Sequence, residues 1–248
     1  MGRKARLYCE SQVYHVIMRG NNKQNLFYED SDRYLFIRRL KKYTEELQID
    51  VYSYCLMSNH VHILIGKANK NMSKLIQRLA TSYAMYFNRK YERSGHLFQG
   101  RYKSEPVDSD EYFKTVTRYI IQNPLKANLE DFINYRWNGL QHLIRESKNC
   151  LIEKNRLYEV FEGKENFFRF IMEKQTGKCM EYENKFVLND NQCVKYIKKL
   201  LGINSTYNLI SMTPETQKTK LSILKEKGIP VNQISRITGI ALGIIKRA

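Results

Sequence analysis

One stretch of the chain constrains its fold more than any other: residues 52–65, with the sequence YSYCLMSNHVHILI. Two alternating apolar runs flank the turn-forming pair Ser58-Asn59, and the second run opens with a His-x-His triplet that spans His60 and His62. This pattern predicts a β-hairpin. Because side chains two residues apart on a strand point to the same face, we expect the two imidazoles to lie side by side.

Two readings of the histidine pair are open at this point. Two neutral imidazoles on one face of a strand can bind a divalent metal ion. A His-x-His triplet also occurs by chance, as a solvated or hydrogen-bonded pair with no ligand. The pair alone does not decide between them, and the residues that favour a metal site come later in the chain.

The composition predicts a folded, soluble protein. With 248 residues, of which 42% are hydrophobic, the chain can bury a core and form one domain with appendages or two small domains. Its apolar runs are shorter than the roughly 18 residues that span a membrane. The first eight residues, MGRKARLY, lack the apolar centre of a signal peptide, so we expect a cytoplasmic location.

The charge balance points to a polyanionic partner. Lys and Arg number 42 against 25 Asp and Glu, which gives a net charge of +17 at pH 7 and favours nucleic acid as the partner. An AT-rich genome would also raise the lysine content, but it does not explain why Asp and Glu fail to rise in step. The five cysteines are widely spaced without a C-x-x-C pair, so neither a disulfide framework nor a zinc knuckle is indicated.

Residues 1–145 have the pattern of an α+β domain. Besides the hairpin, we expect a strand at Val13–Met18 with His15 in the sheet interior, a helix from Glu29–Asp32 to about Leu47, a helix capped by Ser73, a bent edge strand or ordered loop at Ser94–Val107, and a helix from Asp108–Glu111 to Asn123. This order predicts a ferredoxin-like antiparallel sheet with packed helices.

The remainder of the chain is predicted to be helical and to divide in two. Residues 146–205 form a helical region with amphipathic segments at Phe167–Lys174 and Asn191–Leu201. Residues 206–248 have the pattern of a helix-turn-helix, with helices at 214–228, 232–238 and 241–247 and buried positions at Ile234, Ile240 and Ile245. The last of these helices is about two turns long, and Lys246 and Arg247 are its only polar readers.

A polar stripe on the third helix of the α+β domain carries candidate chemistry. Helical spacing puts Tyr119, Gln122 and Asn123 on one face, beside an apolar stripe that can face the sheet. On spacing alone, Tyr119 is also explained as a boundary residue with its ring packed and its hydroxyl in water.

At these residues the sequence resembles the single-tyrosine HUH transposases, and within them the REP-associated tyrosine transposases of bacteria. The matching segments are YHVIMRGNN at 14–22, LMSNHVHILI at 56–65, GHLFQGRYKS at 95–104, YIIQNPLKANL at 119–129 and YRW at 135–137. The histidine pair together with the Tyr-x-x-x-Asn-Pro string is far more specific than either motif alone.

The resemblance implies a site and a reaction. His60 and His62 would hold Mg²⁺ or Mn²⁺, with Asn123 as third ligand; Gln122 is the alternative if Pro124 distorts the last turn. Tyr119 would attack a scissile phosphate and form a 5′-phosphotyrosine and a free 3′-OH. The resemblance does not identify the base that takes the tyrosine proton.

The implied partner is single-stranded or hairpin DNA, and the chain would act as a monomer or a homodimer. The candidate DNA-binding residues are Arg19, Lys23, Arg101, Lys103, Lys246 and Arg247. We therefore expect a metal-dependent DNA endonuclease and strand transferase. A non-catalytic, domesticated DNA-binding regulator and an RNA-binding protein are the alternatives. The presence of both histidines and Tyr119 in one chain favours the enzyme.

Overall fold

The computed structural model describes residues 9–127, 131–145, 150–175, 177, 179–181 and 190–248. The chain divides into two compact units, residues 1–181 and 182–248. This division differs from the boundaries predicted at residues 145 and 205. The helices up to residue 172 bury apolar side chains in the core of the first unit, which a sequence pattern cannot reveal because it does not say what an amphipathic helix packs against.

The first unit is built on a four-stranded antiparallel sheet. Its strand order is β2-β3-β1-β4, which is the order of a ferredoxin-like fold and confirms the predicted fold class. The strands are β1 (Tyr14–Arg19), β2 (Asp50–Leu56), β3 (His60–Gly66) and β4 (Lys103–Pro106). The predicted hairpin is formed by β2 and β3, and the predicted edge strand is β4.

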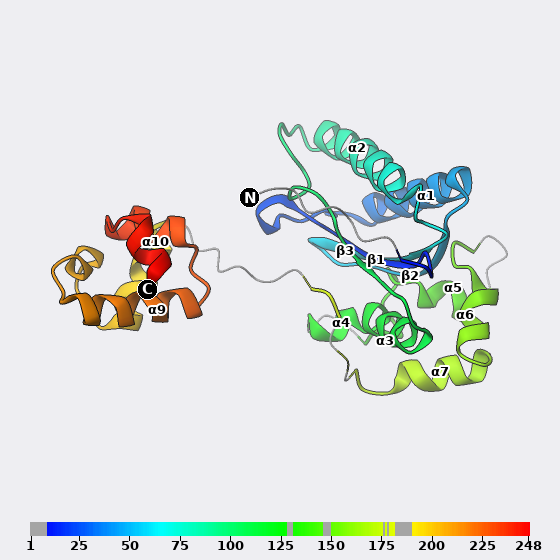
Figure 1. Cartoon of the computed structure of the whole chain (residues 1–248). Coiled ribbons are helices and arrows are strands. Elements are labelled where there is room, and N and C mark those ends of the chain that lie inside the picture. Colours follow the sequence, from blue (N-terminus) through cyan, green and yellow to red (C-terminus); the bar gives the residue numbers. More distant parts are fainter. Residues whose placement is uncertain (1–8, 128–130, 146–149, 176, 178, 182–189) are drawn as a thin grey trace. The chain divides into compact units, whose positions relative to one another are not determined.

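Helices cover both faces of this sheet (Figure 1). Helices α1 (Asp30–Leu47) and α2 (Met72–Lys90) pack together on one face, as the long apolar stripe of each helix requires. Helix α3 (Asp110–Ile121) contacts β2 and β3 from the opposite face. Helix α3 thus lies on the sheet face that α1 and α2 do not cover.

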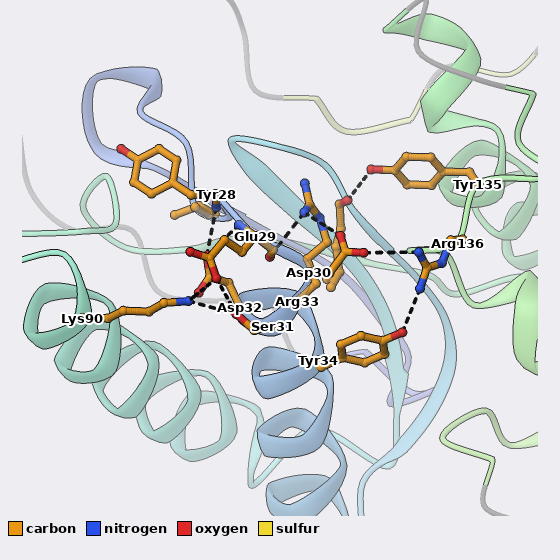
Figure 2. A network of polar contacts seen from close by, with 12 residues as sticks. Tyr28, Glu29, Asp30, Ser31, Asp32, Arg33, Tyr34, Lys90, Tyr135 and Arg136 are labelled. Atoms are coloured by element: carbon orange, nitrogen blue, oxygen red, sulfur yellow. Dashed lines mark hydrogen bonds and ion pairs between the residues drawn. The ribbon is translucent and has the colours of Figure 1, made fainter.

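A buried carboxylate fastens α1 to α2. Asp32 is fully buried, and its oxygens accept hydrogen bonds from the backbone nitrogen of Glu29 at 3.0 Å, Lys90 Nζ at 2.8 Å and Tyr91 Oη at 2.7 Å. Figure 2 shows Lys90 reaching from α2 to this carboxylate. Together with the Glu29 side chain, Asp32 forms a capping box at the start of α1, which gives partners to backbone nitrogens that would otherwise be unpaired.

Helix α3 begins and ends with recognisable signals. The Ser109 side chain caps it by accepting a hydrogen bond from the backbone nitrogen of Tyr112 at 3.1 Å. It ends at Ile121, before the predicted end at Asn123, and α4 (Asn123–Lys126) follows at once. Pro124 lies in the first turn of α4, where its missing N–H costs nothing, so it starts this short helix instead of following the end of α3.

The rest of the first unit completes the core and covers a sheet edge. Helices α5 (Leu140–Ile144), α6 (Lys154–Val160) and α7 (Lys164–Met172) follow α4. The segment before α5 runs along β2: Leu56 N donates to Trp137 O at 2.8 Å, and Tyr135 Oη donates to Leu56 O at 2.7 Å. These bonds satisfy an edge strand that would otherwise expose unpaired backbone groups.

The second unit has a separate apolar core. Its helices are α8 (Asp190–Leu201), α9 (Pro214–Glu226), α10 (Val231–Thr238) and α11 (Leu242–Arg247), with a 3₁₀ turn at Thr206–Leu209. Ile234, Ile240 and Ile245 are buried in this core, as expected from their spacing. Gly239 ends α10 with a φ of +75°, a left-handed conformation that favours glycine and turns the chain into α11.

None of the helices in the described part of the chain has the length and apolar character that crossing a bilayer requires.

Candidate functional site

The two histidines of the His-x-His triplet lie together on β3. Their ring centroids are 5.0 Å apart, and both face the side of the sheet that α3 covers. His60 is half-buried, whereas His62 is 2% exposed. Each ring uses Nδ1 in a contact with a neighbouring side chain: His60 with Asn59 Oδ1 at 2.7 Å and His62 with His15 Nε2 at 2.9 Å. Nε2 is therefore the nitrogen with which each ring can bind a cation.

Tyr119 and Asn123 approach the histidines from the opposite helix. The Tyr119 ring lies edge-on to His62, with ring centroids 5.6 Å apart. Asn123 follows one turn later at the start of α4, and its Nδ2 donates to Tyr119 O at 3.3 Å. The alternating strand and the last turn of α3 thus bring the expected ligands and nucleophile together within a single chain.

Burial keeps the histidines neutral. It lowers the pKa of His60 to about 4, with a contribution from the Arg19 cation in the same direction. It lowers the pKa of His62 well below its ordinary value, and the neighbouring His15 and His60 act in the same direction. Neutral imidazole is the form that binds metal ions, so both rings are ready for a cation near neutral pH.

The hydroxyl of Tyr119 is protonated and covered. Burial and the negative charge of Glu181 raise its pKa, and the side chain is only 2% exposed. Its Oη donates to Glu181 Oε1 at 3.1 Å, while Lys126 Nζ contacts the same oxygen at 2.9 Å and lies 4.1 Å from the ring centroid. A phosphate that is to reach Tyr119 must therefore take the place of the Glu181 carboxylate.

The donor set fits a divalent cation that keeps open positions for substrate. Within the described residues, no group of three or more His, Cys, Asp or Glu side chains is placed to hold a metal. The available set is two imidazole nitrogens and the amide oxygen of Asn123, whose nitrogen is occupied by Tyr119 O. Three neutral ligands leave the charge of the metal uncompensated, which suits an ion that binds an anionic phosphate.

Gln122, the alternative third ligand, lies on another side of the helix. Its Nε2 donates to two carbonyls at the end of α7, Ile171 O at 2.6 Å and Glu173 O at 2.7 Å. These bonds turn its amide toward α7, so Asn123 is the better placed of the two amides.

The candidate DNA-binding residues are divided between the two units of the chain. Arg19 ends β1 directly opposite His60, and Lys103 Nζ on β4 donates to Glu181 O at 3.2 Å. Lys23 is exposed in a 3₁₀ turn at Asn21–Lys23 after β1, and Arg101 is exposed in the loop before β4. The remaining pair, Lys246 and Arg247, lies on the exposed side of α11 in the second unit.

Several site residues were not expected from the sequence. His15 is in the sheet interior as expected, but it contacts His62; Glu105, Lys126 and Glu181 also surround the site. Strand alternation places His15 on one face of β1, but only the pairing register shows that this is the face of His62. Lys126 lies within the resembling segment YIIQNPLKANL, so its position one turn after Asn123 was an available signal.

Comparison with known proteins identifies the domain that carries this site. Residues 9–123 match the family model of IS200-like transposases. The fold is similar to that of a REP-associated tyrosine transposase bound to a REP hairpin, with a TM-score of 0.52 and 11% identity over 76% of this chain and 100% of that chain. A putative transposase from Deinococcus radiodurans has a TM-score of 0.35 and 17% identity over 52% of this chain and 98% of that chain. No curated protein matches the sequence.

The matched region contains every strand of the sheet and ends at Asn123, the last residue of the ligand set. Over residues 9–123, somewhat less than half of the chain, the sequence is similar to the IS200-like transposases.

Proposed function

We propose that this protein is a metal-dependent single-stranded DNA endonuclease and strand transferase that forms a 5′-phosphotyrosine intermediate through Tyr119. The observation that carries the proposal is the convergence of His60, His62, Tyr119 and Asn123 in one chain, with the Tyr119 and His62 rings 5.6 Å apart. A core tyrosine can be packed without two histidines beside it. Phosphodiester transfer, in contrast, needs a nucleophile next to a cation site.

The reaction requires little from the chain beyond positioning and charge. Tyr119 Oη forms a bond to phosphorus, the bond from phosphorus to the 3′ oxygen breaks, and the phenolic proton balances the new 3′-OH. Mg²⁺ or Mn²⁺ held by His60, His62 and Asn123 would stabilise negative charge on the phosphate oxygens. Lys126, 4.1 Å from the tyrosine ring centroid, supplies a further positive charge beside the developing phenolate.

The proposed substrate is hairpin-forming repeat DNA. The similar structure of a REP-associated transposase is bound to a REP hairpin, which supports this class of substrate for the present chain. Arg19, Lys23, Arg101 and Lys103 are proposed as phosphate contacts around the site. Every phosphate of DNA carries a negative charge, so cationic side chains around the site are needed to bind the strand.

The second unit is proposed to add a helix-turn-helix contact. The glycine turn between α10 and α11 and the buried isoleucines support this reading. Because α11 presents only Lys246 and Arg247 as polar readers, we expect it to hold phosphates more than to read bases. Replacing both by alanine should make the slope of log K against log salt for hairpin binding shallower, by the amount that about two phosphate contacts contribute. An unchanged slope would contradict this role.

Covalent adduct formation tests the catalytic proposal. A hairpin oligonucleotide labelled at its 3′ end is incubated with protein and Mn²⁺, and the products are separated on a denaturing gel. We expect wild-type protein to retain the label and Tyr119→Phe to abolish retention while folding and hairpin binding persist. Tyr52→Phe is the matched control, because Tyr52 is a buried tyrosine on β2 outside the ligand set. Adducts at normal yield in Tyr119→Phe would refute the assignment.

A non-catalytic regulator is the second candidate, favoured by one observation. The Tyr119 hydroxyl donates a hydrogen bond to the Glu181 carboxylate, so the candidate nucleophile is covered in this structure. A regulator would bind repeat hairpins tightly and leave them uncut with Mn²⁺ present, and it would form no adduct even when Glu181 is replaced by alanine. Cleavage by wild-type protein or by Glu181→Ala would exclude this candidate.

A further inference from the structure

His15 is a buried histidine that the proposed reaction does not use directly. It is fully buried on β1, and its Nε2 lies 2.9 Å from His62 Nδ1. The two rings are stacked, with centroids 5.2 Å apart and an interplanar angle of 22°. A buried imidazole is costly unless its nitrogens find partners, so this contact calls for an explanation beyond packing.

The contact determines how both rings must carry their protons. A neutral histidine has one N–H and one acceptor nitrogen. If His62 is to bind a cation through Nε2, its proton must be on Nδ1 and must be donated to His15 Nε2. His15 must then carry its own proton on Nδ1. The opposite arrangement, with His15 Nε2 as donor, would put the His62 proton on Nε2 and block that nitrogen.

Glu105 favours the arrangement that leaves His62 Nε2 free. It lies directly opposite His15 in the pairing of β1 with β4, and its Oε2 is 4.0 Å from His15 Nδ1. That nitrogen has no hydrogen-bond partner among the described residues, so the carboxylate is the charge that acts on its proton. A negative charge on this side attracts the proton to Nδ1 of His15 and leaves Nε2 as the acceptor.

Glu105 is itself held in place. Its Oε2 accepts hydrogen bonds from Tyr112 Oη at 2.6 Å and from the backbone nitrogen of Met180 at 3.2 Å. Contact with His15 lowers the pKa of Glu105, and the Tyr112 bond acts in the same direction, so the carboxylate stays ionised. The chain of contacts therefore runs from α3 through β4 and β1 to the ligand on β3.

We propose that Glu105 and His15 form a positioning chain that holds His62 in the tautomer with its proton on Nδ1 and presents Nε2 to the divalent cation. This inference rests on the proposed function, because it assigns a role toward the same metal site. His15 and Glu105 are positioning residues, since neither is a ligand nor touches the reacting atoms. Outer partners of this kind orient a ligand ring and raise its basicity, and their loss typically weakens metal binding by about 10- to 100-fold.

The first test measures Mn²⁺ affinity of the full chain by electron paramagnetic resonance of the free ion. His15→Phe keeps a buried ring and removes the acceptor, so we expect Mn²⁺ to bind about 10- to 100-fold more weakly. His15→Gln places an amide oxygen near the former Nε2 and should recover most of the affinity. Glu105→Gln should weaken binding less than His15→Phe, and Glu111→Gln, an exposed carboxylate on α3, should change nothing.

The second test observes the tautomer directly. Nitrogen-15 NMR of histidine side chains in metal-free protein should show His62 with its proton on Nδ1 in the wild type and in His15→Gln. In Glu105→Gln, where the charge that orients His15 is gone, we expect a mixture of His62 tautomers. Glu105→Gln retains all of the buried rings, so it keeps the test decisive if His15→Phe fails to fold.

The outcomes separate this inference from the proposed function. Wild-type protein that binds Mn²⁺ but forms no adduct would refute the transposase mechanism, while the affinities and tautomers would still judge the positioning chain. Unchanged Mn²⁺ affinity in both His15→Phe and Glu105→Gln, or a wild-type His62 proton on Nε2, would overturn the positioning chain even if adducts form normally.

Discussion

Two buried polar clusters lie on opposite faces of the same sheet, and they are built differently. Around Asp32, between α1 and α2, one carboxylate accepts hydrogen bonds from the backbone nitrogens of Tyr28 and Glu29 and from Lys90, Tyr86 and Tyr91. Around His62, under α3, the two histidines of the triplet each use Nδ1 in a side-chain contact, and Nε2 is the nitrogen proposed to bind a cation.

This difference separates structure from function. A fully satisfied buried group stabilises one geometry, because every lone pair has a partner and any displacement leaves one unpaired. A partly satisfied group costs folding free energy and is kept when something else binds it. On this basis we interpret the Asp32 cluster as structural and propose that the histidine cluster is functional. Four changes can break or sharpen the distinction.

The largest effect is expected from His62→Leu. Removing one ligand should lower the rate of adduct formation by about 10²- to 10³-fold, the usual loss for one group that stabilises transition-state charge. Because the change leaves the buried Nε2 of His15 without its partner, the free energy of unfolding should fall by about 1–2 kcal/mol, less than the loss expected from Asp32→Ala. Both are measured on one preparation, by denaturing gel and by calorimetry. A loss of unfolding free energy as large as that from Asp32→Ala would mean that this cluster is structural after all.

Asp32→Ala should have the reverse pattern. It leaves Lys90 and two tyrosines without their shared buried acceptor, so we expect the free energy of unfolding to fall by about 3 kcal/mol. Adduct formation per folded molecule should be unchanged at low temperature. Asp30→Ala, in the same first turn but 52% exposed on its side chain, should cost less than about 1 kcal/mol in urea unfolding. Equal costs for the two variants would contradict the buried network.

Acid should release the stability that Asp32 provides. Burial alone would raise its pKa, but hydrogen bonds from Lys90 and Tyr91 prevail and lower the pKa to about 2. A carboxyl group whose folded pKa is depressed stabilises the protein above its unfolded pKa, near 4, and loses that contribution as the pH falls from about 4 to about 2. The stability difference between wild type and Asp32→Asn should shrink by about 1–2 kcal/mol over this window, with allowance for solvent around Lys90.

The smallest effect is expected from Tyr91→Phe. It removes one donor from a carboxylate that keeps several others, so unfolding free energy should fall by about 1 kcal/mol. Tyr28→Phe is the control, because Tyr28 contributes its backbone nitrogen and its ring is 52% exposed. A loss from Tyr91→Phe as large as that from Asp32→Ala would show that the donors act as a single unit and would contradict separate contributions from each donor.

Local pattern predicted much of the fold. The alternation at 52–65 predicted β2 and β3, and the cap and spacing signals predicted α1 and α3 to within two residues. The start of α2 differs slightly, since Asn71 precedes the helix in place of Ser73. These successes share a cause: hairpins and helix ends are determined by residues within a few positions of one another.

The division of the chain was beyond such signals. Helix α7 is amphipathic like α8, but α5, α6 and α7 bury apolar side chains in the core of the first unit, and α8 buries its own in the core of the second. Amphipathicity records that a helix has an apolar side and leaves its partner unspecified. The short helix at Asn123 is a similar case, because Pro124 is compatible both with the end of one helix and with the start of the next.

The sequence by itself determined that His60 and His62 share a face and that Tyr119 and Asn123 share another, since both follow from the period of a single element. Tertiary structure decided that these two faces meet, that His15 contacts both His62 and Glu105, and that Glu181 covers the tyrosine hydroxyl. The reason is that register and packing are set by contacts between residues far apart in the chain, which no local period records.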